Sequence, residues 1–222
     1  MNIIGIDFSI LYPGICISND FKDFKWIGIA NNKITKKDTK LMEEISLTYP
    51  NLKLHCLGER AKKENQYHIN ERNKLENYIK LTDYIIDKIK EHTKRTDNII
   101  AIEGISFGSS GNSLVDISQA TGIVKSKLLT LTDTIQKVFV FSPSELKNAI
   151  GCKGNASKID VYNQFKKDPI IEAAKKSDLY KLLNQDEGVI FNGKNIKSPY
   201  MDMVDSYLPI VKIYNILKNN EQ

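Results

Sequence analysis

The chain has 222 residues, of which 41% are hydrophobic and 27% are charged, and its formal net charge is +5. This composition is ordinary for a globular domain. No apolar run approaches the roughly 20 residues that span a bilayer, and the N-terminus lacks the features of a signal peptide. We therefore expect a cytoplasmic protein with no membrane partner. The mild basicity is compatible with nucleic-acid binding but does not by itself indicate it.

Cysteine and histidine give no sign of a metal or disulfide framework. Cys16, Cys56 and Cys152 are scattered, and no C-x-x-C pair occurs. His55 stands beside Cys56, but adjacent residues of a strand point to opposite faces and do not easily share a metal ion. We expect reduced structural cysteines.

The first third of the chain predicts a small antiparallel meander. Short β-branched and aromatic runs predict strands over residues 2–7, 13–18 and 24–30. Residues 31–70 are polar, lysine-rich and weakly periodic. We expect a further strand near 52–58 within an otherwise exposed insertion.

Helices and strands then alternate. Apolar residues at helical spacing predict a helix from about 71 to 92. Strands are expected over 98–103 and 137–141. Between them, Ser113 and Asp116 have the spacing of a capping box, which predicts a helix over 113–131.

Capping signals also mark the helices of the last third. Ser142 with Glu145, and Ser157 with Asp160, each predict a helix start. Asn192-Gly193 predicts a hairpin within 188–198. A final helix is expected from Ser198-Pro199 to about 218, kinked or broken at Pro209.

These elements predict an α/β fold in which a mixed central sheet is flanked by helices. The sheet would combine a three-stranded antiparallel meander with parallel strands. The absence of a linker predicts a single domain over 1–222, with insertions near 31–70 and 168–198.

Four acidic residues are candidate metal ligands: Asp7, Glu103, Asp202 and Asp205. Asp7 and Glu103 each end an apolar strand, and the carboxyl ends of neighbouring parallel strands lie together. Asp202 and Asp205 are three apart on one helix face, beside apolar residues that would pack on the sheet. Taken singly, each acid is explained as a turn, cap or solvated residue. Together they would repel one another unless divalent cations neutralise them, and an all-oxygen ligand set suits Mg²⁺ or Mn²⁺.

Several of these segments resemble the RuvC-type Holliday junction resolvases of the RNase H-like superfamily. GIDFSILYPGICI resembles the first two strands of that family, and DMVDSYLPIVK resembles its terminal helix. IEGISFGSSGNSLVDISQATGIVKSKL resembles its second acidic strand, aromatic-containing loop and following helix. SPSELKNAIGCKGNASKIDVYNQF resembles its basic segment. The similarity covers about two-thirds of the chain, in the family's order.

The resemblance implies an RNase H-like fold and a metal-dependent endonuclease. Asp7, Glu103, Asp202 and Asp205 would bind two Mg²⁺ ions, for which Mn²⁺ could substitute. Lys158 would lie near the scissile phosphate. The chain would act as a homodimer, partly through the 113–131 helix, and would cut branched DNA, chiefly four-way junctions, with paired nicks.

The resemblance also implies DNA-binding residues. Lys147 and Lys158 would contact DNA or phosphate, and Phe107 would stack on bases at the junction. Lys153, between two glycines in residues 151–158, could approach a DNA backbone closely. This run lacks the spacing of a P-loop, so we expect no nucleotide cofactor.

Alternatives stay open at this stage. The insertions could favour a broader debranching or flap endonuclease, and size and an AT-rich type of composition suggest a bacteriophage-like version. An actin-like ATPase or sugar kinase also begins with a strand, an acid and a small-residue turn, but no second phosphate-loop run is present. A non-catalytic junction-binding protein is the remaining alternative.

Overall fold

The computed structural model of the chain describes all residues except 59–64, 94–97, 106–110, 186–190, 193–194 and 221–222. The strands are β1 Asn2–Asp7, β2 Gly14–Asn19, β3 Asp23–Ala30, β4 Leu52–Cys56, β5 Asn98–Glu103, β6 Val138–Phe141, β7 Phe191–Asn192 and β8 Asn195–Ile196. The α-helices are α1 Lys36–Thr48, α2 Tyr67–His92, α3 Asn112–Leu128, α4 Pro143–Ala149, α5 Lys158–Lys167, α6 Asp178–Gln185 and α8 Tyr200–Asn220. Short 3-10 helices are η1 Leu129–Leu131, η2 Ile135–Lys137 and η3 Glu172–Lys176.

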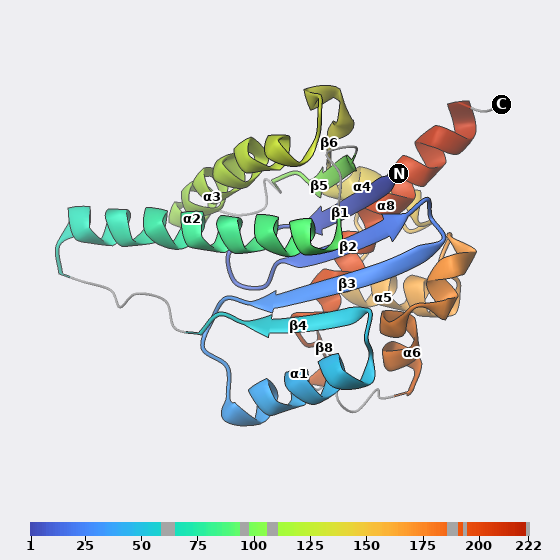
Figure 1. Cartoon of the computed structure of the whole chain (residues 1–222), viewed down its shortest axis with the longest axis horizontal. Coiled ribbons are helices and arrows are strands. Elements are labelled where there is room, and N and C mark those ends of the chain that lie inside the picture. The colour runs from blue at the N-terminus through green and yellow to red at the C-terminus, as the bar shows by residue number, and fades with distance from the viewer. Residues whose placement is uncertain (59–64, 94–97, 106–110, 186–190, 193–194, 221–222) are drawn as a thin grey trace.

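One six-stranded mixed sheet, in the order β4-β3-β2-β1-β5-β6, forms the centre of the fold (Figure 1). β1, β2 and β3 pair antiparallel, which confirms the predicted meander. β5 pairs parallel with β1 and with β6, and β4 extends the other edge in parallel with β3. The predicted α/β fold with a mixed sheet flanked by helices is therefore confirmed.

Each face of the sheet has its own core, because successive strand residues point to opposite sides. Alternating isoleucines, such as Ile4 and Ile6 of β1, pack against α2 and α3. The other face, which includes Ile3, packs against α8 together with α4, α5 and α6. Figure 1 shows α2 and α3 on one side of the sheet and α8 on the other.

The expectation of an exposed excursion over 31–70 is wrong in part. The strand near 52–58 forms as β4, but the segment before it contains α1, which buries Met42 and Ile45. Two buried positions in 13 residues are too weak a periodic signal to reveal a helix against a polar background.

Two other predictions at helix ends or within helices are corrected. α3 begins after Gly111 with no side-chain cap, so Ser113 and Asp116 do not form a capping box. The Asp116 carboxylate instead pairs with Lys74 of α2 at 3.0 Å. α8 continues through Pro209 without a break, since only one backbone N–H is lost and packing on the sheet holds both halves. The capping boxes of α4 and α5 are confirmed.

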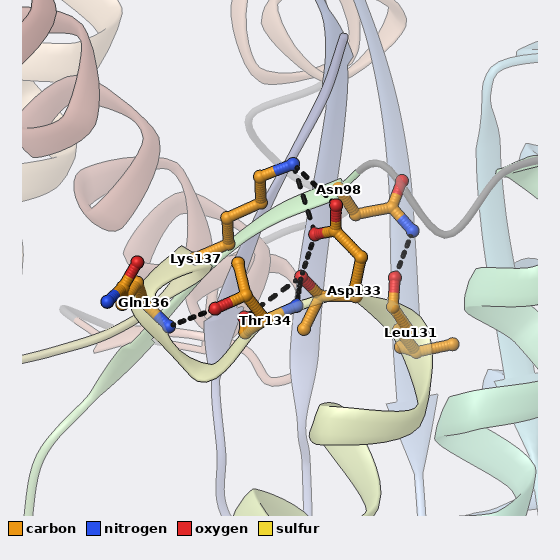
Figure 2. Close-up of polar contacts among 7 residues, drawn as sticks. Asn98, Leu131, Asp133, Thr134, Gln136 and Lys137 are labelled. Atoms are coloured by element: carbon orange, nitrogen blue, oxygen red, sulfur yellow. Dashed lines mark hydrogen bonds and ion pairs between the residues drawn. The ribbon is translucent and has the colours of Figure 1, made fainter.

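Asn98 anchors β5 at the end opposite Glu103. Its buried side-chain amide donates to the Leu131 carbonyl at 2.6 Å and accepts a hydrogen bond from Asn2 at 3.1 Å. Figure 2 shows this contact beside the turn after η1, where Lys137 pairs with Asp133 at 3.1 Å. The parallel register of β1 and β5 is thus fixed by side chains as well as by the ladder.

Among the described helices, none has the length and apolarity needed to cross a membrane.

Candidate active site

The strand register brings Asp7 and Glu103 together at the carboxyl edge of the sheet. β1 and β5 run in parallel with Ile6 opposite Ile102, and each acid follows its strand's last paired isoleucine. Both acids lie on the same face as Ile3 and Ala101, which is the face that α8 covers. The arrangement predicted from the two strand ends is confirmed.

Two glycines let the backbone of α8 lie directly on the strands beside Asp7. A Cβ on Gly14, which pairs with Asp7 across β1 and β2, would stand 2.0 Å from the Asp202 carbonyl oxygen. A Cβ on Gly5 would stand 2.1 Å from the Ser206 carbonyl oxygen. Any side chain at either position would lift the helix. The glycines therefore set the distance between the acids of α8 and those of the strands.

Burial raises the pKa values of all four carboxyl groups, and repulsion by neighbouring carboxylates adds to this for Asp7, Glu103 and Asp205. Burial is the largest cause in each case. The pKa of Asp7 is raised well above its usual value by burial, and then by Asp205, Glu103 and Asp202. Burial and then the charge of Asp205 raise the pKa of Glu103 to about 7, and burial and then the charge of Asp202 raise that of Asp205 to about 6. Four buried carboxyl groups that repel one another need cations or protons.

Lys158 is the counter-ion of the cluster. It is the first residue of α5, and its Nζ lies 3.2 Å from Oδ2 of Asp205. Its charge lowers the pKa values of Asp7, Glu103, Asp202 and Asp205 alike. Burial alone would lower the pKa of Lys158, but attraction to Asp205, Asp202 and Asp7 outweighs this and raises it. Since 67% of the side chain is exposed, the ammonium group can also reach an incoming phosphate.

Lys147 holds the segment that leads to Lys158. Its Nζ donates to the Ala156 carbonyl oxygen at 2.7 Å, across the turn between α4 and α5. Its charge also lowers the pKa values of Glu103 and Asp205, so it lies close to the acids. Lys153 is exposed on the same turn, and within the described residues no ion pair joins it to an acid. The predicted basic segment is thus beside the site, with Lys147 already engaged by the backbone.

A cleft of about 380 Å³ opens beside the acids. Its walls include Asp7 of β1, Ser9 of the loop that follows, Glu103 of β5, Thr121 of α3 and Lys158. Phe107, predicted to stack on bases, lies outside the described residues, so its position is not described.

The donor set fits a divalent cation. All four side chains offer oxygen, which hard cations prefer. Oδ2 of Asp202 is buried and has no hydrogen-bond partner, although Ser198 bonds to the same side chain. Among the described residues, no three acidic, cysteine or histidine side chains form a closed ligand set. To surround a cation, the acidic side chains would have to change conformation, and Lys158 would have to leave Asp205.

The family model for crossover junction endodeoxyribonuclease RuvC matches residues 65–176, half of the chain. The chain belongs to the RuvC family. The matched region contains Glu103, Lys147 and Lys158. Asp7, Asp202 and Asp205 lie outside the match, and it is the fold that brings them to Glu103.

Solved RuvC and resolvase structures are similar over most of the chain. Thermus thermophilus RuvC has 14% identity and a TM-score of 0.46, covering 97% of this chain and 96% of that one. T. thermophilus RuvC in complex with Holliday junction substrate has 13% identity and a TM-score of 0.47, covering 98% and 96%. The yeast mitochondrial Holliday junction resolvase Ydc2 has 15% identity and a TM-score of 0.46, covering 95% and 76%. A comparison with curated proteins finds no match.

Sequence reasoning found the four acids but missed Gly5, Gly14 and Ser198, which position two of them. The sequence did contain a signal for the two glycines, since both lie in apolar strand segments. Glycine inside an apolar strand weakens it and often marks the close approach of another backbone. No sequence signal distinguished Ser198 from an ordinary helix cap.

Proposed function

We propose that this RuvC-family protein is a Mg²⁺-dependent endonuclease that resolves four-way DNA junctions by paired nicks. The observation that carries the proposal is the convergence of Asp7, Glu103, Asp202 and Asp205 around the ammonium group of Lys158. Burying four carboxylates lowers the stability of the fold. A protein that only binds DNA would gain nothing in return for this loss. The matched family supplies the substrate class.

The four carboxylates would hold two Mg²⁺ ions, with Mn²⁺ as a substitute. When bound, the two ions would activate the attacking water and stabilise the leaving oxygen of the phosphodiester. Asp202 contributes the buried oxygen atom that lacks a partner. Lys158, once its bond to Asp205 is released, would donate to the phosphate and offset charge that develops there.

DNA contacts would lie around the cleft. The exposed ammonium group of Lys153 stands on the turn between α4 and α5, where it could contact a phosphate. Lys147 would act on DNA through the position of that turn, since its own ammonium group is bonded to Ala156. Phe107 remains a proposed stacking residue on the basis of the family resemblance.

A homodimer would use the groove between α2 and α3. The groove measures about 890 Å³, and its apolar wall includes Leu75, Ile79 and Ile123. Leu75 is 49% exposed and Ile79 38% exposed, while a Cβ on Gly122 would meet nothing within 4 Å. An exposed apolar groove with an open glycine on one wall suits the close approach of a second α3.

Cleavage of labelled DNA tests the proposal. Four-way junctions, Y-forks, flaps and linear duplexes, each incubated with Mg²⁺ and with EDTA, separate the candidate activities. Symmetric paired nicks confined mainly to four-way junctions, and only with metal, are the expected result. Cutting of every branched substrate would instead indicate a debranching nuclease on the same fold. Binding without cutting in Mg²⁺ or Mn²⁺ would overturn the proposed activity.

A further inference from the structure

A second cavity, of about 410 Å³, lies where the chain enters α8. It is formed by α1, by the segment that enters α8 and by Tyr12 of the loop after β1. Both α1 and the entering segment belong to regions that sequence analysis expected to be insertions. We name this cavity the α1 pocket.

The α1 pocket has the chemical character of a nucleobase site. Ile34, Leu41 and Ile196 supply apolar walls, while Asp38 and Asn195 supply hydrogen-bonding groups. A flat aromatic base with donors and acceptors on one edge matches such a mixture of apolar and polar walls. Tyr200 also lines the pocket, and its phenol, protonated at neutral pH like that of any tyrosine, adds a hydrogen-bond donor.

Two hydrogen bonds link residues of the α1 pocket to residues of the candidate active site. The Tyr12 backbone N–H donates to Oγ of Ser9 at 2.8 Å, and Ser9 lines the cleft while Tyr12 lines the pocket. On the other side, Ser198 lines the pocket and its side chain bonds to Asp202. The α1 pocket therefore adjoins Ser9 and Asp202, and a nucleotide beside a phosphate held at the carboxylates is the part of a DNA strand that would enter it.

The charges of the α1 pocket favour particular bases. The Asp38 carboxylate is an acceptor that pairs with exocyclic amino groups, which cytosine and adenine carry and thymine lacks. Its own bond from Thr35 Oγ1, at 2.6 Å, fixes one oxygen and leaves the other available. Lys197 lines the same pocket, and none of the ion pairs among the described residues involves it, so it is available to a phosphate.

We infer that the α1 pocket binds an unpaired, amino-bearing base of the substrate strand next to the scissile phosphate and thereby sets the sequence preference of cleavage. This inference rests on the proposed nuclease function. It assigns a role to α1 and to the segment entering α8, neither of which contributes an acid to the metal site.

Cleavage of a junction series tests the inference. Each nucleotide that flanks the cut is varied in turn to thymine or to an abasic site. At one flanking position, the wild-type protein is expected to cut junctions with cytosine or adenine about tenfold faster than those with thymine or no base. Asp38→Asn should reduce this preference, whereas Glu44→Gln, an exposed acid on the same helix, should leave it unchanged. Efficient cleavage with no preference at any flanking position would overturn the inference while the nuclease proposal stands.

A fluorescence measurement tests occupancy without cleavage. A 2-aminopurine at the preferred position should change its emission when the junction binds the wild-type protein in EDTA. Leu41→Trp, which fills the pocket, should abolish this change, and Leu47→Trp, 84% exposed on the same helix, should preserve it. An equal response in both tryptophan variants, or a response to the free 2-aminopurine nucleotide equal to that of the junction, would overturn the assignment to the substrate strand. Failure of the proposed function has a different signature, which is the absence of cleavage in every junction of the series.

Discussion

Lys158 Nζ lies 3.2 Å from Oδ2 of Asp205, so the first residue of α5 neutralises an acid of α8. This contact joins the basic segment to the carboxylate cluster before any cation or DNA is bound. Under the proposed mechanism it also implies an order of events, because Asp205 would have to exchange the ammonium group for a metal ion. Lys158 would then be free to contact the phosphate.

Replacing Asp7 tests the metal site directly. Asp7→Asn removes one charged ligand and keeps the size of the side chain, so it should abolish cleavage of a four-way junction in Mg²⁺. Folding and junction binding should be nearly unchanged, as measured by circular dichroism and by gel shift in EDTA. Retained cutting would sink the hypothesis that Asp7 holds the metal.

The raised pKa of Glu103 predicts a pH-dependent stability of the metal-free protein. An acid whose pKa is higher in the folded state binds its proton more tightly there, so stability is lost as pH rises from about 4.5 to about 7. Glu103→Gln should therefore raise the melting temperature at pH 8 in EDTA, by on the order of 5 °C, and have little effect at pH 4. Glu44→Gln, at an exposed position of α1, serves as the control, and equal shifts at both pH values would contradict the prediction.

Gly14 should tolerate no side chain. A Cβ 2.0 Å from the Asp202 carbonyl forces α8 away from β2. Gly14→Ala should therefore destabilise the protein by about 3 kcal/mol or more and reduce cleavage. Gly122→Ala is the matched control: it places a Cβ in open space within a helix and should stabilise the monomer by up to about 1 kcal/mol. Urea unfolding at low protein concentration measures both. A wild-type midpoint for Gly14→Ala would show that the helix is not seated on this glycine.

Lys147 and Lys153 should differ in the step that they affect. Lys147→Met frees the turn before Lys158, and a misplaced Lys158 should slow cleavage by on the order of a hundredfold with junction affinity largely kept. Lys153→Met removes an exposed charge from the same turn and should weaken DNA binding. The slope of log affinity against log salt concentration should fall by about 1. Single-turnover cleavage and salt-dependent binding separate the two effects. A drop in affinity for Lys147→Met as large as that for Lys153→Met would make Lys147 a direct DNA contact.

The proposed dimer depends on the groove between α2 and α3. Ile79→Asp places a charge on its apolar wall and should convert a dimer to a monomer in light scattering after size exclusion. Leu47→Asp, on α1, is the matched control and should leave the mass unchanged. A wild-type protein that is already monomeric at working concentration would rule out this interface.

The elements with strong local signals could be predicted from sequence. The meander, the parallel strand ending in Glu103 and the capping boxes at Ser142 and Ser157 all appear in the structure. Local chemistry also suggested a capping box at Ser113, but Asp116 pairs with Lys74 of another helix instead. Such a long-range partner leaves no trace in the spacing of neighbouring residues.

The site itself was predictable as a set of acids but not as a geometry. Strand-end acids and a helical Asp pair suffice to suggest Asp7, Glu103, Asp202 and Asp205. Their separation depends on Gly5 and Gly14, which act by having no side chain, and the position of Lys158 beside them depends on the hydrogen bond from Lys147 to Ala156. Pockets such as the one beside α1 arise from segments distant in sequence, so composition and periodicity cannot reveal them.

The seating of α8 on Gly5 and Gly14 joins acids from distant parts of the chain. Asp7 lies on β1, which is synthesised long before α8, the helix that carries Asp202 and Asp205. If the four acids act as the proposed ligand set, a nascent chain would have the meander and Glu103 before it had all four ligands. Cleavage would then begin only after α8 had docked on the sheet, and proteolytic loss of that helix would abolish it.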